Sequence, residues 1–151
     1  MTNQERAMDD RQAIEVAMAT YSQALDARDW ALLDQVFAED VAAVTLAPEA
    51  VRGRANFVAM ISGFLDPCGP TQHLFGPTLA TVEGDTATST TPFRAFHCDQ
   101  LYATRVYEAI GRYHVRWRRT AEGWRATRWE YALAAHVGDP SLLGAAIPQA
   151  S

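Results

Sequence analysis

Asp26 and His73 are the two residues whose types and surroundings point most directly to chemistry. Asp26 closes an amphipathic helix in segment 21–30, and His73 opens an apolar strand in segment 71–76. A carboxylate that accepts the proton of one imidazole nitrogen fixes the tautomer and leaves the other nitrogen free as a base. Such a pair can transfer protons without a metal or a cofactor. We predict a general acid–base site if the two side chains meet, and an ordinary core histidine if they do not.

Four more polar side chains are expected to face the same interior. By strand parity His97 points inward, where it could protonate a leaving group, hold a water or bind a substrate oxygen; the alternative is a core histidine bonded to backbone. Tyr21 and Tyr113 could donate to a carbonyl or hydroxyl group, or simply form wall. Arg128 has the same strand parity as Trp124. If its side chain points inward, it would steady an enolate or an acidic substrate; the alternative is a surface arginine. The residues expected to form pocket wall and core are Trp129, Phe57, Met60 and Phe64.

Three helices are expected to precede the strands. The first has apolar residues at steps of four, three and four, which keep one face buried, after a cap at Asp9 or Asp10 and a frayed start over residues 1–8. A second helix should begin with Asp29 as its cap, and a third should begin near Asn56.

The later part of the chain alternates as strands do. The expected strands are 41–46, 73–82, 85–98, 104–119 and 123–136. Alternate residues from Tyr107 to Trp117 should face a core or pocket, and Gly111 among them favours a bend or bulge. Helices followed by an antiparallel meander predict an α+β architecture, with three N-terminal helices on a strongly curved antiparallel sheet. We expect a single domain over 1–151, with an ordered core over about 9–137 and a tail over 138–151 that is loosely ordered or docks a second copy.

Composition narrows the range of partners. The 151 residues carry a net charge of −5, whereas phosphate binding needs a basic surface, so no nucleic-acid partner is expected. Cys68 and Cys98 have no C-x-x-C spacing, which argues for free thiols in a reducing compartment and against a zinc site. The N-terminus has no apolar signal region and no stretch reaches the length of a membrane span. We expect a cytoplasmic protein with no metal and no cofactor.

Three sequence segments together are similar to one protein family. They are Tyr21…Leu25-Asp26…Asp29-Trp30…Leu33…Phe37…Asp40, Gly53-Arg54, and Gly111-Arg-Tyr113…Arg119-Thr…Gly123-Trp124-Arg125. They resemble the SnoaL-like group of the nuclear-transport-factor-2-like superfamily, over about residues 9–137. The resemblance implies a cone-shaped α+β barrel, in which a curved sheet wraps the first helix and leaves a deep apolar pocket. Relatives often form dimers or trimers, so a homodimer or homotrimer is expected.

The resemblance also assigns roles to particular residues. The segment around His73 is similar to the one that carries a catalytic histidine in scytalone dehydratase. Asp26 matches the aspartate that orients the equivalent histidine in hexachlorocyclohexane dehydrochlorinase and bile-acid dehydratase. His97 looks like the second pocket histidine of scytalone dehydratase. Thr45 departs from that enzyme, which would have a water-binding tyrosine there, so its particular substrate is not carried over.

Two functional hypotheses follow from these residues. The first is a cofactor-independent lyase or isomerase of the dehydratase type, in which His73 takes a proton from carbon in a small cyclic or aromatic apolar substrate. Epoxide hydrolysis and polyketide cyclisation are its enzymatic competitors in the same pocket. The second is a non-catalytic small-molecule binder or structural subunit, which needs a pocket or an interface but no base. An assembled Asp26–His73 pair at an open cavity would favour the first, because the fold itself hosts many chemistries.

Overall fold

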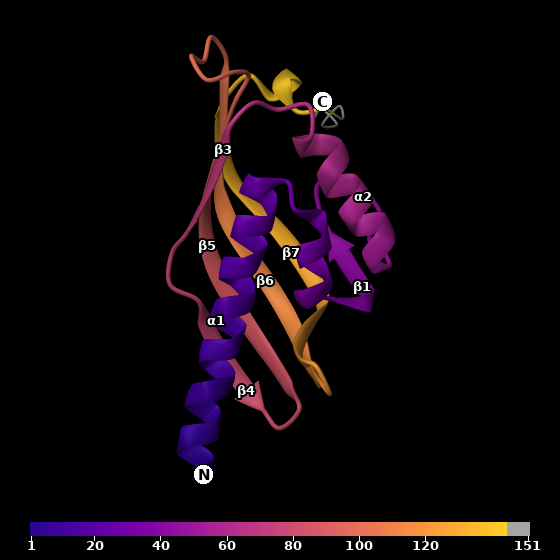
Figure 1. The fold of residues 1–151 in the computed structure, drawn as a ribbon, viewed down its shortest axis with the longest axis vertical. Coiled ribbons are helices and arrows are strands. Elements are labelled where there is room, and N and C mark those ends of the chain that lie inside the picture. Colours follow the sequence, from indigo (N-terminus) through magenta and orange to yellow (C-terminus); the bar gives the residue numbers. More distant parts are fainter. Residues whose placement is uncertain (145–151) are drawn as a thin grey trace.

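The computed structural model describes residues 1–144, which form helices packed on one curled sheet (Figure 1). The helices are α1 (Asn3–Ala27), the 3₁₀ helix η1 (Trp30–Gln35), α2 (Arg54–Leu65) and the 3₁₀ helix η2 (Pro140–Leu142). The strands are β1 (Phe37–Val44), β2 (Val51–Arg52), β3 (Thr71–Phe75), β4 (Leu79–Glu83), β5 (Thr86–Cys98), β6 (Val106–Thr120) and β7 (Gly123–Gly138). The long helix α1 lies along the sheet, and α2 lies beside β1.

The first helix begins earlier than the sequence pattern predicts. Thr2 and Glu5 form a capping box, in which Thr2 Oγ1 accepts from the backbone N–H of Glu5 at 3.1 Å and the Glu5 carboxylate accepts from the backbone N–H of Thr2 at 2.6 Å. The helix therefore already includes residues 3–8, ahead of the start that the sequence pattern indicates. Asp10 is not a cap but a buried carboxylate, whose two oxygens accept from Arg119 at 2.7 Å each.

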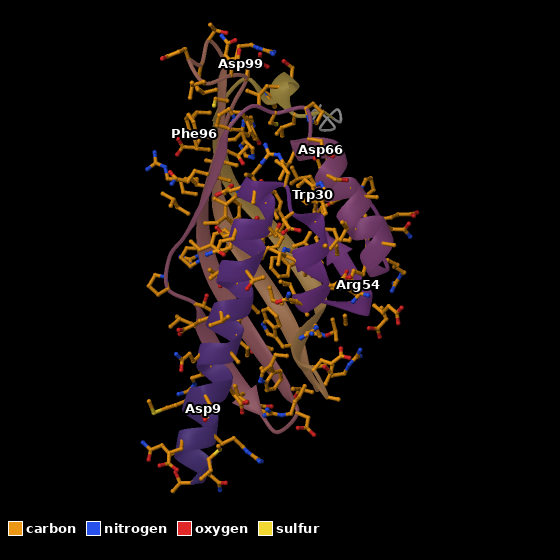
Figure 2. All side chains as sticks on the ribbon, viewed as in Figure 1. Asp9, Trp30, Arg54, Asp66, Phe96 and Asp99 are labelled. Carbon is orange, nitrogen blue, oxygen red and sulfur yellow. The ribbon has the colours of Figure 1, made fainter. Side chains whose placement is uncertain are left out.

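The second helix is a short 3₁₀ helix rather than an α-helix. Asp29 occupies its N-cap position but makes no side-chain capping hydrogen bond. The strand β1 then starts at Phe37, directly after Val36, the residue that ends this short helix. The indole N–H of Trp30 donates to Asp66 at 3.1 Å and ties η1 to the end of α2 (Figure 2).

The sheet is mixed and open. Its seven strands run in the order β2-β1-β7-β6-β5-β3, and β4 pairs with β5 beyond the end of β3. Neighbouring strands are antiparallel except β1 and β7, which are parallel. The expectation of an all-antiparallel sheet is wrong at this pair, and the sheet curls without closing into a barrel. Local alternation does not reveal this pairing, because β1 and β7 lie at opposite ends of the chain.

The predicted strand over 73–82 is two strands. The chain leaves the sheet at Gly76 and returns as β4, and Gly76 donates its N–H to the carbonyl of Pro92 at 2.9 Å. The carbonyl and nitrogen of one strand residue point to the same side, so the nitrogen of Pro92 faces the gap between β3 and β4. A proline without an N–H is tolerated there.

The curvature of the sheet comes from two irregularities between β6 and β7. The pairing shifts by one residue between Ile110 and Gly111, and again between Arg116 and Trp117, where Thr127 is the additional residue of β7. A side chain at Gly111 would meet the carbonyl oxygen of Ala132 and the ring of Phe93, so this close approach needs a glycine. The predicted inward face of β6 is confirmed, since Tyr107, Ala109, Tyr113, Val115 and Trp117 are buried.

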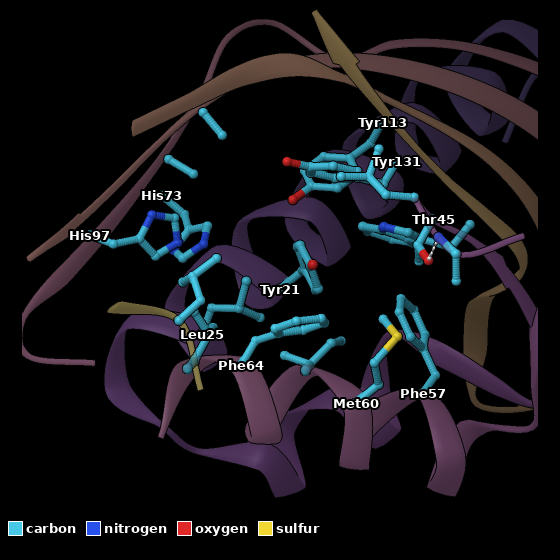
Figure 3. A pocket seen from close by; sticks show the side chains of 18 of the residues that line it. Tyr21, Leu25, Thr45, Phe57, Met60, Phe64, His73, His97, Tyr113 and Tyr131 are labelled. Carbon is cyan, nitrogen blue, oxygen red and sulfur yellow. Dashed lines mark hydrogen bonds between the residues drawn. The ribbon is translucent and has the colours of Figure 1, made fainter. Parts of the chain in front are cut away.

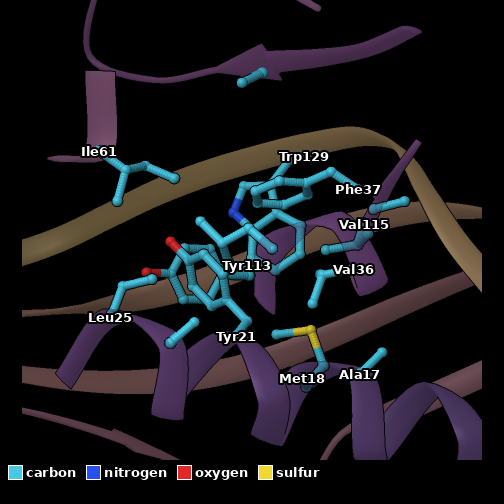
Figure 4. Packing of buried hydrophobic residues seen from close by; sticks show 14 of the residues in the cluster. Ala17, Met18, Tyr21, Leu25, Val36, Phe37, Ile61, Tyr113, Val115 and Trp129 are labelled. Carbon is cyan, nitrogen blue, oxygen red and sulfur yellow. The ribbon is translucent and has the colours of Figure 1, made fainter. Parts of the chain in front are cut away.

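The hydrophobic core fills the space between α1 and the concave face of the sheet (Figure 4). It continues into the segment that the sequence marked as a loose tail. Leu142 of η2 is buried, and Gly144 donates its backbone N–H to the carbonyl of Phe64 on α2 at 3.1 Å. The rest of the expected tail, 145–151, lies outside the described residues.

Cys68 and Cys98 are free thiols, as expected. Among residues 1–144 no helix is long and apolar enough to cross a membrane.

Candidate active site

A cavity of about 190 Å³ opens between α1, α2 and the concave face of the sheet (Figure 3). Its walls are mainly apolar and aromatic, and they contain no Asp, Glu, Lys or Arg among the described residues. The lining residues are Tyr21, Leu25, Thr45, Leu46, Ala47, Phe57, Met60, Ile61, Phe64, Leu65, His73, Ala95, His97, Tyr107, Ala109, Tyr113, Trp129, Tyr131 and Leu143. An enclosed, largely apolar space with a few polar groups is the usual form of a small-molecule site.

The structure brings Asp26 and His73 together at one end of this cavity. Asp26 stands on the last turn of α1 and His73 on β3, and Asp26 Oδ1 lies 2.7 Å from His73 Nδ1. The other carboxylate oxygen, Oδ2, accepts the backbone N–H of His73 at 3.0 Å. The carboxylate therefore holds both the ring and the backbone of the residue that it orients. The His73 side chain is buried and lines the cavity.

The hydrogen bonds keep Asp26 ionised. Burial by itself raises the pKa of this carboxyl, but the ring and backbone N–H groups of His73, together with the hydroxyl of Thr71, hold the pKa below its ordinary value. An ionised carboxylate can only accept, so His73 Nδ1 carries the proton in this pair. The opposite ring nitrogen, Nε2, is then unprotonated in the neutral ring and able to act as a base.

Arg28 and Thr71 support the pair from behind, and sequence reasoning missed both. Thr71 donates its hydroxyl to Asp26 Oδ1 at 3.0 Å, and Arg28 donates to Thr71 Oγ1 at 2.8 Å. Arg28 also donates to the carbonyls of Leu25, Leu65 and Gly69, which joins the end of α1 to the chain entering β3. Its backbone is left-handed, with φ +58°, at the residue where α1 ends. An arginine just after a helix gives no sequence signal for this role.

His97 is the second histidine of the cavity, and its ring centroid lies 5.3 Å from that of His73 (Figure 3). Its Nδ1 lies 3.1 Å from the carbonyl oxygen of Tyr107, which can only accept, so Nδ1 carries a proton. Burial, followed by the charge of nearby His73, lowers the pKa of His97 to about 4. The ring is therefore neutral at pH 7, with Nε2 available as a hydrogen-bond acceptor rather than as an acid.

Tyrosines form the wall facing the two histidines. Figure 3 shows the hydroxyls of Tyr113 and Tyr131 on the side of the cavity where His73 and His97 lie. Burial raises the pKa values of Tyr21, Tyr113 and Tyr131, so all three hydroxyls remain neutral donors at any physiological pH.

Arg128 does not reach the cavity. The additional residue Thr127 reverses the alternation of β7, so Trp129 and Tyr131 face inward after Trp124 and Ala126. Arg128 is turned outward, where it lies 3.7 Å from the carboxylate of Glu130. Of the two alternatives that the sequence left for Arg128, the structure agrees with the surface one. The described lining residues include no Lys or other Arg that could take its place.

The remaining expected residues all lie on the cavity wall. Phe57, Met60 and Phe64 line the cavity from α2, and Trp129 lines it from β7. Leu143, from the segment expected to be a loose tail, closes part of the wall. No group of three His, Cys, Asp or Glu side chains within residues 1–144 is arranged to hold a metal ion.

Comparisons with known proteins agree with this architecture. The family model for the SnoaL-like domain matches residues 6–130. A nuclear-transport-factor-2-like protein with a cystatin-like fold from Novosphingobium aromaticivorans is 31% identical, with 87% of this chain and 86% of that chain covered and a TM-score of 0.68. No functionally curated protein matches the sequence.

Two more distant structures share the fold. A provisionally named scytalone dehydratase from Novosphingobium aromaticivorans is 20% identical, with 86% of this chain and 87% of that chain covered and a TM-score of 0.74. Hexachlorocyclohexane dehydrochlorinase LinA-type3 from Novosphingobium barchaimii is 12% identical, with 91% and 94% covered and a TM-score of 0.78. With the match to the family model, these likenesses confirm the resemblance seen in the sequence: the chain belongs to the SnoaL-like family of the nuclear-transport-factor-2-like superfamily.

Proposed function

We propose that this protein is a cofactor-independent lyase of the dehydratase type, in which His73 is the general base and Asp26 orients it. The observation that carries the proposal is the 2.7 Å contact between Asp26 Oδ1 and His73 Nδ1, with His73 on the wall of an apolar cavity. A positioned base of this kind contributes on the order of a hundred- to ten-thousand-fold to the rate. The structural neighbours named as a dehydratase and a dehydrochlorinase bear the names of elimination reactions, which agrees with this chemistry.

The proposed reaction is the loss of water from a cyclic β-hydroxyketone. His73 Nε2 takes the proton from the carbon next to the carbonyl, and the electron pair of that C–H bond forms the new C=C bond. The C–O bond to the β-hydroxyl breaks, and the imidazolium of His73 returns the proton to the departing oxygen as water. His97 Nε2 accepts a hydrogen bond from the substrate hydroxyl and orients it, because His97 donates its own Nδ1–H to Tyr107.

The substrate class follows from the walls. The cavity presents aromatic rings from Tyr21, Phe57, Phe64 and Tyr113, which favour a flat apolar ring system. Because no charged side chain lines it, a carboxylate or phosphate group would lose its hydration without gaining a counterion. We therefore propose a neutral cyclic or aromatic substrate.

The test is the dehydration of 3-hydroxy-1-tetralone, which loses water to give 1-naphthol and is followed by absorbance. The His73→Ala variant should lose at least a hundredfold in kcat, and Asp26→Asn should lose activity by a smaller factor because the ring keeps its place but not its fixed tautomer. His114→Ala is the control, since this histidine is exposed on the outside of the sheet.

Exchange of the carbon-bound protons of 1-tetralone in D₂O gives a second readout, because it needs only the base and no leaving group. Exchange without dehydration would support an isomerase rather than a dehydratase. Unchanged turnover in His73→Ala would refute the assignment of the base. Tight binding with neither exchange nor turnover would favour the non-catalytic binding protein.

A homodimer or homotrimer remains a proposal as well. Leu74, Phe96 and Ile110 are exposed on the outer face of neighbouring strands, with 54%, 38% and 43% of their surfaces accessible. Arg94 stands between Leu74 and Ile110 in the strand register, and the three exposed apolar side chains around it are suited to burial against a second copy. Analytical ultracentrifugation of wild type and Ile110→Lys tests this, since a monomer at every micromolar concentration would contradict it.

A further inference from the structure

The indole nitrogen of Trp129 is a buried donor without a hydrogen-bond partner. Among residues 1–144 it is the one fully buried side-chain nitrogen or oxygen atom that has no hydrogen-bond partner. Buried polar groups in native proteins nearly always have partners, so such an exception calls for an explanation in terms of function.

The other indoles of the chain show that the exception is specific. Trp117 donates its N–H to Ser89 Oγ at 2.8 Å, Trp124 donates to Asp10 at 3.0 Å, and Trp30 donates to Asp66 at 3.1 Å. Trp117 is as deeply buried as Trp129 and stands on the neighbouring strand. Three of the four tryptophans are therefore satisfied by the protein, and the unsatisfied one is the tryptophan that lines the cavity.

The bulge in β7 is what directs Trp129 toward the cavity. Its ring packs against Tyr21, with centroids 4.5 Å apart, and against Tyr113, with centroids 5.1 Å apart. Figure 4 shows its nitrogen on the same side as the hydroxyl oxygens of Tyr21 and Tyr113. An indole N–H can only donate, and no acceptor of the described residues lies within hydrogen-bond distance of it, so what is missing at this nitrogen is an acceptor.

We infer that the indole N–H of Trp129 binds an acceptor oxygen of the ligand, namely the carbonyl of a neutral, flat ketone. The inference rests on the proposed function only in placing the ligand in this cavity, and it adds which group of the ligand is recognised and by which residue. The walls supply no cation to attract a carboxylate, so a neutral carbonyl is the acceptor that fits. When a base removes a proton beside that carbonyl, its oxygen gains negative charge and the same N–H bond strengthens. Trp129 is thus a binding residue that also favours the enolate over the ketone.

The experiment compares 1-tetralone with tetralin, which has the same rings without the oxygen. In a ¹H–¹⁵N spectrum of wild type, the indole resonance that disappears in Trp129→Phe should move downfield on adding 1-tetralone and should not do so on adding tetralin. By calorimetry, 1-tetralone should bind about tenfold more tightly than tetralin, as expected for a hydrogen bond that satisfies a buried donor. The Trp129→Phe variant should lose this preference.

Trp117→Phe is the matched control, because it removes an equally buried indole whose N–H already has Ser89 as its partner. It should keep the tenfold preference for 1-tetralone. Equal affinities of wild type for the two compounds, or an unmoved Trp129 indole resonance with 1-tetralone bound, would overturn the inference. Such a result would leave the elimination assay unaffected. Conversely, if His73→Ala kept full activity in the elimination assay, the preference of the cavity for the ketone could still be measured and would still support the role of Trp129.

Discussion

Replacing His97 with asparagine should make the protein less sensitive to acid. The asparagine amide can still donate to the carbonyl of Tyr107 in place of Nδ1–H, but it cannot be protonated. In the wild type, burial and the nearby His73 lower the pKa of His97 to about 4, whereas an unfolded histidine has a pKa of about 6.5. Between these two values the unfolded chain binds a proton that the folded protein rejects, so acid favours unfolding.

The size of the effect follows from this difference in pKa. Each pKa unit corresponds to about 1.4 kcal/mol, so a fall of roughly 2.5 units corresponds to about 3 kcal/mol of unfolding free energy. The folded-state pKa is depressed, so the contribution is fully present above about pH 6.5 and is lost as the pH falls through about 4. The groups that face the ring are His73, Tyr107, Arg28 and Asp26, and of these His73 and Arg28 oppose its protonation while Asp26 favours it.

The assay is urea unfolding followed by circular dichroism at several pH values from 7 to 4. Wild type should lose about 3 kcal/mol more than His97→Asn over this range, with the steepest divergence between pH 6 and pH 4.5. His114→Asn, at an exposed histidine, should follow the wild-type curve. Parallel curves for wild type and His97→Asn would refute the claim that a buried, neutral His97 is part of the folded state.

Two further predictions concern the framework around the cavity. Gly111→Ala should lower the free energy of unfolding in urea by about 3 kcal/mol, because the new methyl group would meet the carbonyl oxygen of Ala132. The control is Gly63→Ala, whose methyl group would stand in open space on α2. It should be neutral or stabilise the protein by up to about 1 kcal/mol. Asp10→Ala should lower the free energy of unfolding by about 3 kcal/mol, because it leaves the Arg119 guanidinium and the Trp124 indole N–H without their buried partner. The control is Asp40→Ala, which breaks the exposed pair with Arg118 and should change the urea midpoint little. Equal midpoints within either pair of variants would contradict the corresponding assignment.

The sequence by itself determined the features that depend on local geometry. The spacing of apolar residues places Asp26 at the end of α1, and two-residue alternation turns His73 and Tyr113 toward the interior. Turn residues at Gly84 and Gly123 predict the hairpins that join β4 to β5 and β6 to β7, and both glycines have positive φ. These features need only a few neighbouring residues to define them, so they can be read without knowing the rest of the fold.

Only the tertiary structure decided how these elements meet. A single additional residue, Thr127, reverses the alternation of β7, so Trp129 enters the cavity and Arg128 leaves it. The tautomer of His97 depends on a carbonyl of another strand, and the support of Asp26 depends on Arg28 reaching the start of β3. Each of these depends on how one strand or helix meets another. Residue type and spacing place a side chain on a face, but only the packed fold gives it a hydrogen-bond partner or leaves it without one.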